Sequence, residues 1–289
     1  MDLKRELQWY PGHMAKAVRQ MREQMKLVDL VIEVIDARIP SSARNPELDQ
    51  IAQGKIRLLI MAKADLADPA ETDRWLSYFR SQNLNAAAID ARRKQDMKYV
   101  KEQISCLVKA KQERDKKRGI RFRPVRALVV GIPNVGKSTL INSLASRSVA
   151  KTGNKPGVTK GQQWIKCPQG YELLDTPGIL WPKFTDQTEG MHLALIGTMP
   201  DSLKLVSPEK MALAAIEYGL KAWPEKLTED YQISMEQEPA EYLNKIAERL
   251  HAVKSGGAPD TEKAANVLMD RFRKGVMGPV TLEYAPDMA

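Results

Sequence analysis

Hydrophobic residues follow two alternating patterns along the first part of the chain. Short, nearly continuous apolar runs are typical of strands covered on both faces, and they occur near 30–35, 56–61, 86–89, 127–131, 162–167 and 171–174. Between them, apolar residues repeat with the period of a helix near 14–28, 71–82, 97–118 and 137–145. This alternation predicts an α/β fold with a doubly wound, mostly parallel sheet.

The pattern changes after about residue 185, where runs typical of strands end. Helical periodicity follows near 188–197, 208–221, 239–253 and 261–274, with a Gly/Pro break at 255–259. The length of 289 residues fits one α/β domain and a smaller one. We therefore expect an α/β domain over 1–185 and an all-helical C-terminal domain over 186–289.

The first helical pattern places methionine and valine side chains on one face: Met14, Val18, Met21, Met25 and Val28. Such a stripe indicates either core packing or a groove for a partner. Core packing is the favoured interpretation.

A phosphate-binding loop lies in the middle of the chain. Residues 131–138 read Gly131-Ile132-Pro133-Asn134-Val135-Gly136-Lys137-Ser138, between an apolar strand run and a helical pattern. In such a loop the backbone N–H groups and the helix N-terminus converge on phosphates. We expect Lys137 to neutralise the β- and γ-phosphates and Ser138 to ligate Mg²⁺. The predicted phosphate-site residues are Asn134, Val135, Gly136, Lys137, Ser138 and Thr139.

A second nucleotide motif follows the phosphate loop. The strand run 171–174 ends in Asp175-Thr176-Pro177-Gly178, which matches D-x-x-G. Asp175 is expected to reach Mg²⁺ through water, and the Gly178 N–H to sense the γ-phosphate. Thr159, in the intervening Gly/Pro-rich stretch, is a candidate to complete the Mg²⁺ shell. These elements in this order are typical of GTPases.

The guanine-reading motif, N-K-x-D, has no complete match after D-x-x-G: Asn244-Lys245-Ile246-Ala247 lacks the Asp. The strand run 56–61, however, ends in Ala62-Lys63-Ala64-Asp65. The Asp65 carboxylate can accept from both N1–H and N2–H₂ of guanine, while Lys63 would lie over the base. Ala62 replaces the Asn, which should cost about 0.5–1.5 kcal/mol of nucleotide affinity.

The next strand run leads to the turn expected to cradle the base, Asp90-Ala91-Arg92. Ala91 keeps the backbone N–H that such a turn offers to guanine. The predicted base-side residues are therefore Ala62, Lys63, Ala64, Asp65, Asp90 and Ala91.

The guanine motif thus precedes the phosphate loop, which is a circular permutation of the usual order. Permutation preserves a core because domain termini lie at the surface and often close together. The chain resembles the circularly permuted GTPases of the ribosome biogenesis GTPase A (YlqF/RbgA) family. Besides the loop motifs, three stretches carry the resemblance: Gln8-Trp9-Tyr10-Pro11-Gly12-His13-Met14-Ala15-Lys16-Ala17, Asp36-Ala37-Arg38-Ile39-Pro40 and Asp175-Thr176-Pro177-Gly178-Ile179-Leu180-Trp181-Pro182.

The resemblance implies an assembly factor that binds and hydrolyses GTP. Such a factor binds a late precursor of the large ribosomal subunit in the GTP state and leaves after hydrolysis. Its C-terminal helices face rRNA, and we expect a monomer. Two alternatives from other classes remain: a nucleotide-gated RNA- or ribosome-binding module with little hydrolysis, and an RNA scaffold that holds a structural nucleotide. Asp65 argues against ATP use.

Hydrolysis raises a separate question. Ile179 stands where Ras-like enzymes place the Gln that orients the attacking water, so we expect slow intrinsic turnover, stimulated by the ribosomal subunit. The resemblance implies His13 as the residue that supports hydrolysis; its chemistry alone would favour a surface or structural role. Asn134 similarly resembles the ligand of a K⁺ ion, and would otherwise be a turn residue.

Charge is unevenly distributed. The net charge is +9, yet residues 225–289 carry eight Lys/Arg against twelve Asp/Glu. The densest basic cluster joins the guanine half to the phosphate half: Lys109, Lys111, Arg114, Lys116, Lys117, Arg118, Arg121, Arg123 and Arg126. It predicts either a solvated linker helix or a contact with RNA phosphates. A smaller C-terminal patch is expected from Arg249, His251, Lys254, Arg271, Arg273 and Lys274.

Cellular compartment is inferred from composition. Two cysteines, Cys106 and Cys167, give no disulfide framework. Apolar runs are too short for a membrane span, and the N-terminus lacks the core of a signal peptide. We expect a cytoplasmic protein with no membrane partner.

Overall fold

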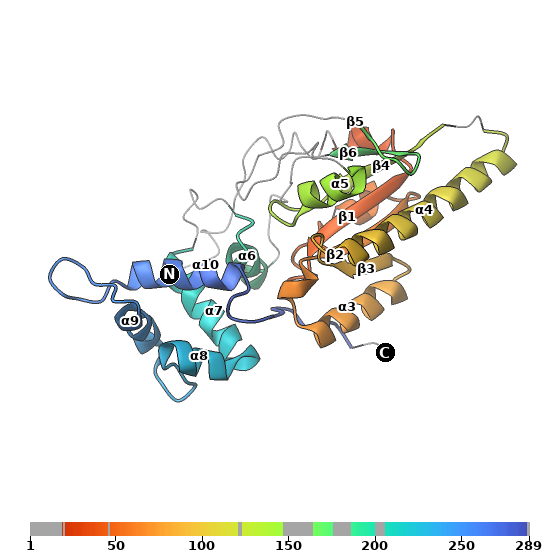
Figure 1. Ribbon diagram of the computed structural model, residues 1–289. Helices are drawn as coiled ribbons and strands as arrows, with labels where there is room; N and C mark the ends of the chain where they lie inside the picture. Colours follow the sequence, from red (N-terminus) through yellow and green to blue (C-terminus); the bar gives the residue numbers. More distant parts are fainter. Residues whose placement is uncertain are drawn as a thin grey trace.

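The computed structural model describes residue 19 and residues 21–45, 47–120, 123–146, 164–175, 186–199 and 206–287 (Figure 1). The sheet lies on one side of the molecule, and most of the C-terminal helices gather on the other. No helix in these ranges is long and apolar enough to cross a membrane.

Six strands form one sheet in the order β3-β2-β1-β4-β6-β5. Their bounds are β1 (Leu30–Asp36), β2 (Ile56–Ala62), β3 (Asn85–Ile89), β4 (Val125–Val130), β5 (Trp164–Lys166) and β6 (Tyr171–Asp175). All pairs are parallel except β5–β6. The predicted α/β fold with a mostly parallel sheet is therefore confirmed.

Helices and short turns connect these strands. They are α2 (Leu48–Ile51), a 3-10 turn (Ala64–Leu66), α3 (Pro69–Ser81), α4 (Lys94–Lys117) and α5 (Lys137–Ala145). Asp68 caps α3 by accepting a hydrogen bond from the Glu71 N–H, and Pro69 occupies the first turn, where its missing N–H costs nothing. The predicted strand and helix runs thus agree with the structure to within a few residues.

The strands are covered on both faces, as their continuous apolar runs predict. Val31 and Leu128 pack in one cluster with Met21, Met25 and Val28. The part of the methionine stripe that the structure describes therefore belongs to the core. Met14 and Val18 lie outside the described residues. The alternate strand residues join a larger core that includes the apolar face of α4, namely Met97, Val100, Ile104 and Val108.

The C-terminal part is helical, as predicted. Its helices are α6 (Gln187–Leu195), α7 (Pro208–Ala222), α8 (Pro224–Tyr231), α9 (Pro239–Arg249) and α10 (Thr261–Arg273). Two details differ from the prediction. Helix α8 was not predicted, and α9 ends at Arg249 rather than near 253. The left-handed backbone of His251 (φ 49°) and a bridge between Val253 and Pro259 take over there.

After α10 the chain returns to the sheet side of the molecule (Figure 1). The Val280 N–H donates to the carbonyl of Leu66, and the Leu282 N–H donates to that of Arg38. The Trp75 indole on α3 donates to the carbonyl of Glu283 at 2.9 Å. Residues 280–285, which we call the C-terminal strap, thus fasten the helical part to the α/β part.

Candidate nucleotide site

The strand order places the predicted motifs at one edge of the sheet. β4 lies between β1 and β6, so the order of strands reverses beside it. In open α/β sheets ligands bind outside the carboxyl ends of the strands at such a point. The phosphate loop follows β4, the guanine motif follows β2, and the turn at Ala91 follows β3.

The phosphate loop is held closely against the sheet. A Cβ on Gly131 would lie 2.2 Å from the Val34 carbonyl oxygen of β1, so only glycine fits. Gly136 has φ 100° and begins α5. Lys137 is buried, and its Nζ donates to the Ile132 carbonyl at 2.8 Å. The ammonium therefore lies against the loop whose N–H groups would surround phosphate.

Ser138 and Thr139 occupy the first turn of α5, where N–H groups have no partner within the helix. The described residues contain no cluster of three His, Cys, Asp or Glu side chains able to hold a metal. Mg²⁺ needs no such cluster, since it keeps several waters and takes one or two carboxylates with phosphate oxygens. Ser138, in the first turn of α5, supplies a hydroxyl that fits that donor set.

Asn134 links the phosphate loop to the helical part. Its backbone is left-handed (φ 62°), and its side-chain amide donates to the Gly197 carbonyl at 2.7 Å. Gly197 lies two residues after the end of α6, whose last carbonyls accept hydrogen bonds from Arg273: Nε to Leu195 and NH2 to Ala194. One side chain of the loop is thus connected, through the end of α6, to α10.

On the guanine side, Lys63 has a left-handed backbone (φ 58°). Its Nζ lies 3.0 Å from Asp36 Oδ2. The Ala62 carbonyl accepts from the Ala37 N–H at 2.9 Å, so the backbone of the motif is fixed despite the missing Asn.

A buried ion pair supports Lys63. Arg38 binds Asp36 through Nε and NH2, both at 2.9 Å, and both side chains are almost fully buried. Burial alone would raise the pKa of Asp36, but the charges of Arg38 and Lys63 hold it far below its usual range. The sequence motif 36–40 marked only a family resemblance; the structure shows that it braces the guanine motif.

Arg92 brings together the two carboxylates predicted at the base. Its NH2 donates to Asp65 at 2.5 Å, and its Nε donates to Asp90 at 2.8 Å. The hydrogen bonds that Arg92 donates to Asp90, together with the charge of Arg92, lower the pKa of Asp90, although partial burial opposes them. Asp90 also accepts from the Arg92 N–H, so its side chain shapes the turn. The Ala91 carbonyl accepts from Ser143 on α5 at 3.4 Å.

The described residues therefore bring Ala62, Lys63, Ala64, Asp65, Asp90 and Ala91 to the same sheet edge as the phosphate loop. His13, Thr159 and Gly178 lie outside the described residues, as does the side chain of Asp175. Ile179 also lies outside them, so its inability to orient the attacking water stays a prediction.

Known proteins resemble this chain in sequence and in structure. The family model described as a 50S ribosome-binding GTPase matches residues 126–240. A Ribosome biogenesis GTPase A of Bacillus cereus is 45% identical over 278 residues, covering 96% of this chain and 93% of the relative. A Mitochondrial ribosome-associated GTPase 1 of Xenopus tropicalis is 33% identical, covering 95% and 94%.

Solved structures agree with these relatives. A GNP-bound YlqF from Thermotoga maritima has a TM-score of 0.67 at 26% identity, covering 94% of this chain and all of that one. The fold, the motif order and the whole-length identity together show that this chain belongs to the ribosome biogenesis GTPase A family and is a GTPase with a role in ribosome assembly.

Proposed function

We propose that the chain is a GTP-dependent switch that binds a late precursor of the large ribosomal subunit and leaves it after hydrolysis. Residues 1–185 act as the GTPase domain, and residues 186–289 act as the ribosome-facing module. The relatives named for ribosome assembly support the partner. The protein acts in the cytoplasm as a monomer.

The observation that carries the proposal is the connection from Asn134 through Gly197 to Arg273. A change at the phosphate loop alters one end of this connection, and α10 is at the other end. Thr159 and Gly178 order their segments around the γ-phosphate and release them on hydrolysis. The state of the nucleotide then biases the position of the helical module.

Each nucleotide contact has a chemical reason. Asp65 reads guanine through N1–H and N2–H₂, the Ala91 N–H faces the base, and Lys63 lies over it. Lys137 and the N–H groups of residues 134–139 bind the phosphates. Ser138 and Thr159 would hold Mg²⁺, with Asp175 through water, and the ion would neutralise the phosphate charge.

Hydrolysis needs a group to position water, because Ile179 has no polar atom. His13 performs this role: a His with a pKa near neutrality can orient or deprotonate water. Asn134 offers its side-chain oxygen to K⁺ while its amide donates to Gly197. Because Ile179 cannot orient water, turnover is slow in the free protein, and the ribosomal subunit stimulates it.

Sedimentation of the protein with large-subunit precursors tests the proposal. The protein should co-sediment with a non-hydrolysable GTP analogue and remain near the top of the gradient with GDP. Turnover is measured in parallel in K⁺ and Na⁺ buffers, with and without subunits. Co-sedimentation that is indifferent to the nucleotide would contradict the switch, and no turnover under any condition would favour a non-hydrolysing binding module.

A further inference from the structure

In the folded chain, several of the positive charges predicted to contact RNA are paired with acidic side chains of the protein. Within the basic cluster, Lys111 and Arg123 bind Asp29, and Arg126 binds Glu172. These side chains hold the end of α4 and the start of β4 together. Their charges are therefore largely neutralised by the protein itself.

The C-terminal patch expected from the sequence is similarly occupied. Arg271 binds Asp230 at 2.8 Å, and Lys274 binds Asp270 at 2.7 Å. Arg273 caps α6 from a half-buried position. Arg249 also donates to the Asp230 carbonyl, so four of the six expected patch residues have partners within the protein, and the surrounding region is net acidic.

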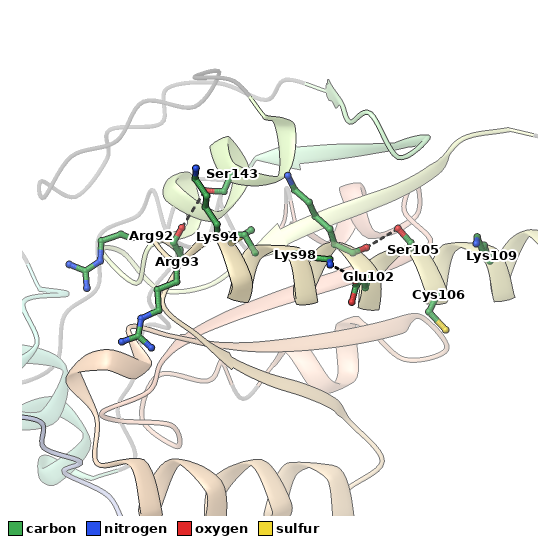
Figure 2. Close-up of a pocket in the computed structure, with 12 residues that line it drawn as sticks. Arg92, Arg93, Lys94, Lys98, Glu102, Ser105, Cys106, Lys109 and Ser143 are labelled. Atoms are coloured by element: carbon green, nitrogen blue, oxygen red, sulfur yellow. Dashed lines mark hydrogen bonds and ion pairs between the residues drawn. The ribbon is translucent and has the colours of Figure 1, made fainter.

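Lysines without strong internal partners also lie in a groove beside α4, and further exposed cations (Arg114, Lys116, Lys117 and Arg118) lie at the end of that helix, outside the groove. This groove, of about 820 Å³, runs along the first two thirds of the helix, with Ser143 of α5 at one side. Figure 2 shows Lys94, Lys98 and Lys109 spaced along α4. Lys94, Lys98, Lys101 and Lys109 line the groove together with one acid, Glu102. Arg92 and Arg93 line it as well, but Arg92 is paired with Asp65 and Asp90, and Arg93 lies 3.8 Å from Asp90.

The spacing places these lysines in one stripe. Residues 94, 98, 101 and 109 follow the three- and four-residue steps of a helical face. The stripe is about 22 Å long at the rise of an α-helix. Lys94 and Lys109 are exposed and have no carboxylate partner among the described residues, and Lys101 donates only to the Ser146 hydroxyl. Lys98 lies 4.0 Å from Glu102 in an exposed, weak pair.

The chemistry of the lining selects the ligand. Exposed lysines in a row bind phosphates and read no bases. The described lining holds no aromatic side chain on which single-stranded bases would stack. We infer that this groove, which we call the α4 groove, is a docking surface for the phosphate backbone of duplex RNA. The inference rests on the proposed ribosomal partner and adds a contact on the GTPase domain itself.

The test compares charge variants in binding to a short RNA duplex at several salt concentrations. The test variant is Lys94→Glu/Lys101→Glu/Lys109→Glu. One control keeps the charge, Lys94→Arg/Lys101→Arg/Lys109→Arg. A second makes the same charge change on exposed lysines of the helical part, Lys221→Glu/Lys254→Glu/Lys263→Glu. GTP affinity and thermal unfolding report whether each variant is folded.

We expect the test variant alone to lose at least tenfold in RNA affinity. The slope of log affinity against log salt should fall by roughly 2 to 3, since each phosphate contact contributes about 0.7–0.9. A photo-crosslinker on exposed Cys106, at the groove, should label the RNA, because Cys167 is buried. Equal losses in the helical control, or stronger binding to anionic vesicles than to RNA, would overturn the inference.

Sedimentation with subunits separates this inference from the proposed function. If the wild type co-sediments in the GTP state and the test variant does so equally well, the α4 groove is not the contact while the switch stands. If the wild type fails to co-sediment yet binds duplex RNA through the groove, the ribosomal switch fails and the groove assignment stands.

Discussion

Asp36 and Arg38 show how a buried charge supports the guanine motif. Replacing Asp36 with Asn removes the charge that pairs both Arg38 and Lys63. Breaking one partner of a buried pair costs about 3–5 kcal/mol, because the other charge stays buried. We expect urea unfolding to show a loss of that size. The control Asp270→Asn, in an exposed pair with Lys274, should lose less than about 1 kcal/mol.

The pH dependence gives this prediction a sign. The pKa of Asp36 is lower in the folded protein than in the unfolded chain, so its stabilising effect is present above the unfolded value of about 4. It is lost as pH falls from there through the folded pKa. The gap between wild type and Asp36→Asn should therefore be constant from about pH 5 to 8 and shrink below about 4. A constant gap at all pH values would show that packing, not charge, is responsible.

Asp65 carries the second prediction at this scale. In Asp65→Asn the amide keeps one acceptor and gains a donor, so it no longer matches the two N–H groups of guanine. Hydrogen bonds to charged groups contribute about 1.5–3 kcal/mol, so GTP affinity should fall at least about tenfold. Xanthosine triphosphate should gain relative affinity, because its C2 carbonyl accepts from the new amide. Fluorescent-nucleotide competition measures both, with exposed Asp73→Asn on α3 as control.

Single residues also show where sequence reasoning succeeds. Asp65 and Lys137 are recognisable because their motifs place fixed chemistry at strand ends. The role of Arg38 cannot be recognised from the sequence. It depends on burial beside Asp36 and on a hydrogen bond to the C-terminal strap, more than 240 positions away. Asn134 is similar: its partner Gly197 has no motif of its own.

At the scale of elements, the end of α6 decides how the phosphate loop meets the helical part. Arg273→Met would remove the side-chain donor to the Leu195 carbonyl and one of the donors to the Ala194 carbonyl, which keeps the Gly197 N–H. A buried carbonyl left unpaired costs about 1–3 kcal/mol. We expect faster hydrogen exchange in α6 and at Gly197, and a weaker effect of GTP on that exchange. Arg249→Met, which removes a donor to an exposed carbonyl of Asp230, is the matched control. Identical exchange in both variants would refute the connection.

Elements differ in how well their patterns predict them. Strands such as β1 are recognised because burial on both faces needs an unbroken apolar run. Helix α8 was missed because Pro224, directly after Trp223, suggests a break, although proline is favoured in the first turn of a helix. The end of α9 depends on the left-handed backbone at His251, which apolar spacing does not encode.

At the scale of the whole molecule, the C-terminal strap makes the two parts one unit. Glu283 accepts hydrogen bonds from the Ser41 N–H at 2.6 Å, from the Ser42 N–H and from the Ser42 hydroxyl. Its Oε1 also lies 2.9 Å from His192 Nδ1 on α6, whose Nε2 meets Tyr218 of α7. One carboxylate thus contacts the loop after β1 and, through His192, two helices. Sequence patterns assign such a terminal segment to its nearest helix and do not predict its return.

Glu283→Ala should separate the two parts without unfolding either. The N–H of buried Ser42 would lose its acceptor, at a cost of about 1–3 kcal/mol, while the exposed Ser41 N–H can bond to water. We expect faster hydrogen exchange in 280–285 and in α6, a broader thermal transition, and earlier proteolysis within the strap. Asp287→Ala, which changes an exposed acid just beyond the strap, should behave as the wild type.

The functional consequence follows from where the strap is attached. It holds α6 against the loop that leads from Asp36 and Arg38, so both ends of the nucleotide site are connected to the helices. Glu283→Ala leaves every predicted nucleotide contact in place, and basal GTP turnover should be unchanged. Co-sedimentation with subunits should lose much of its dependence on GTP against GDP, since the helices no longer follow the phosphate loop. If nucleotide dependence is kept while 280–285 exchanges freely, the switch works through Asn134 and α6 alone.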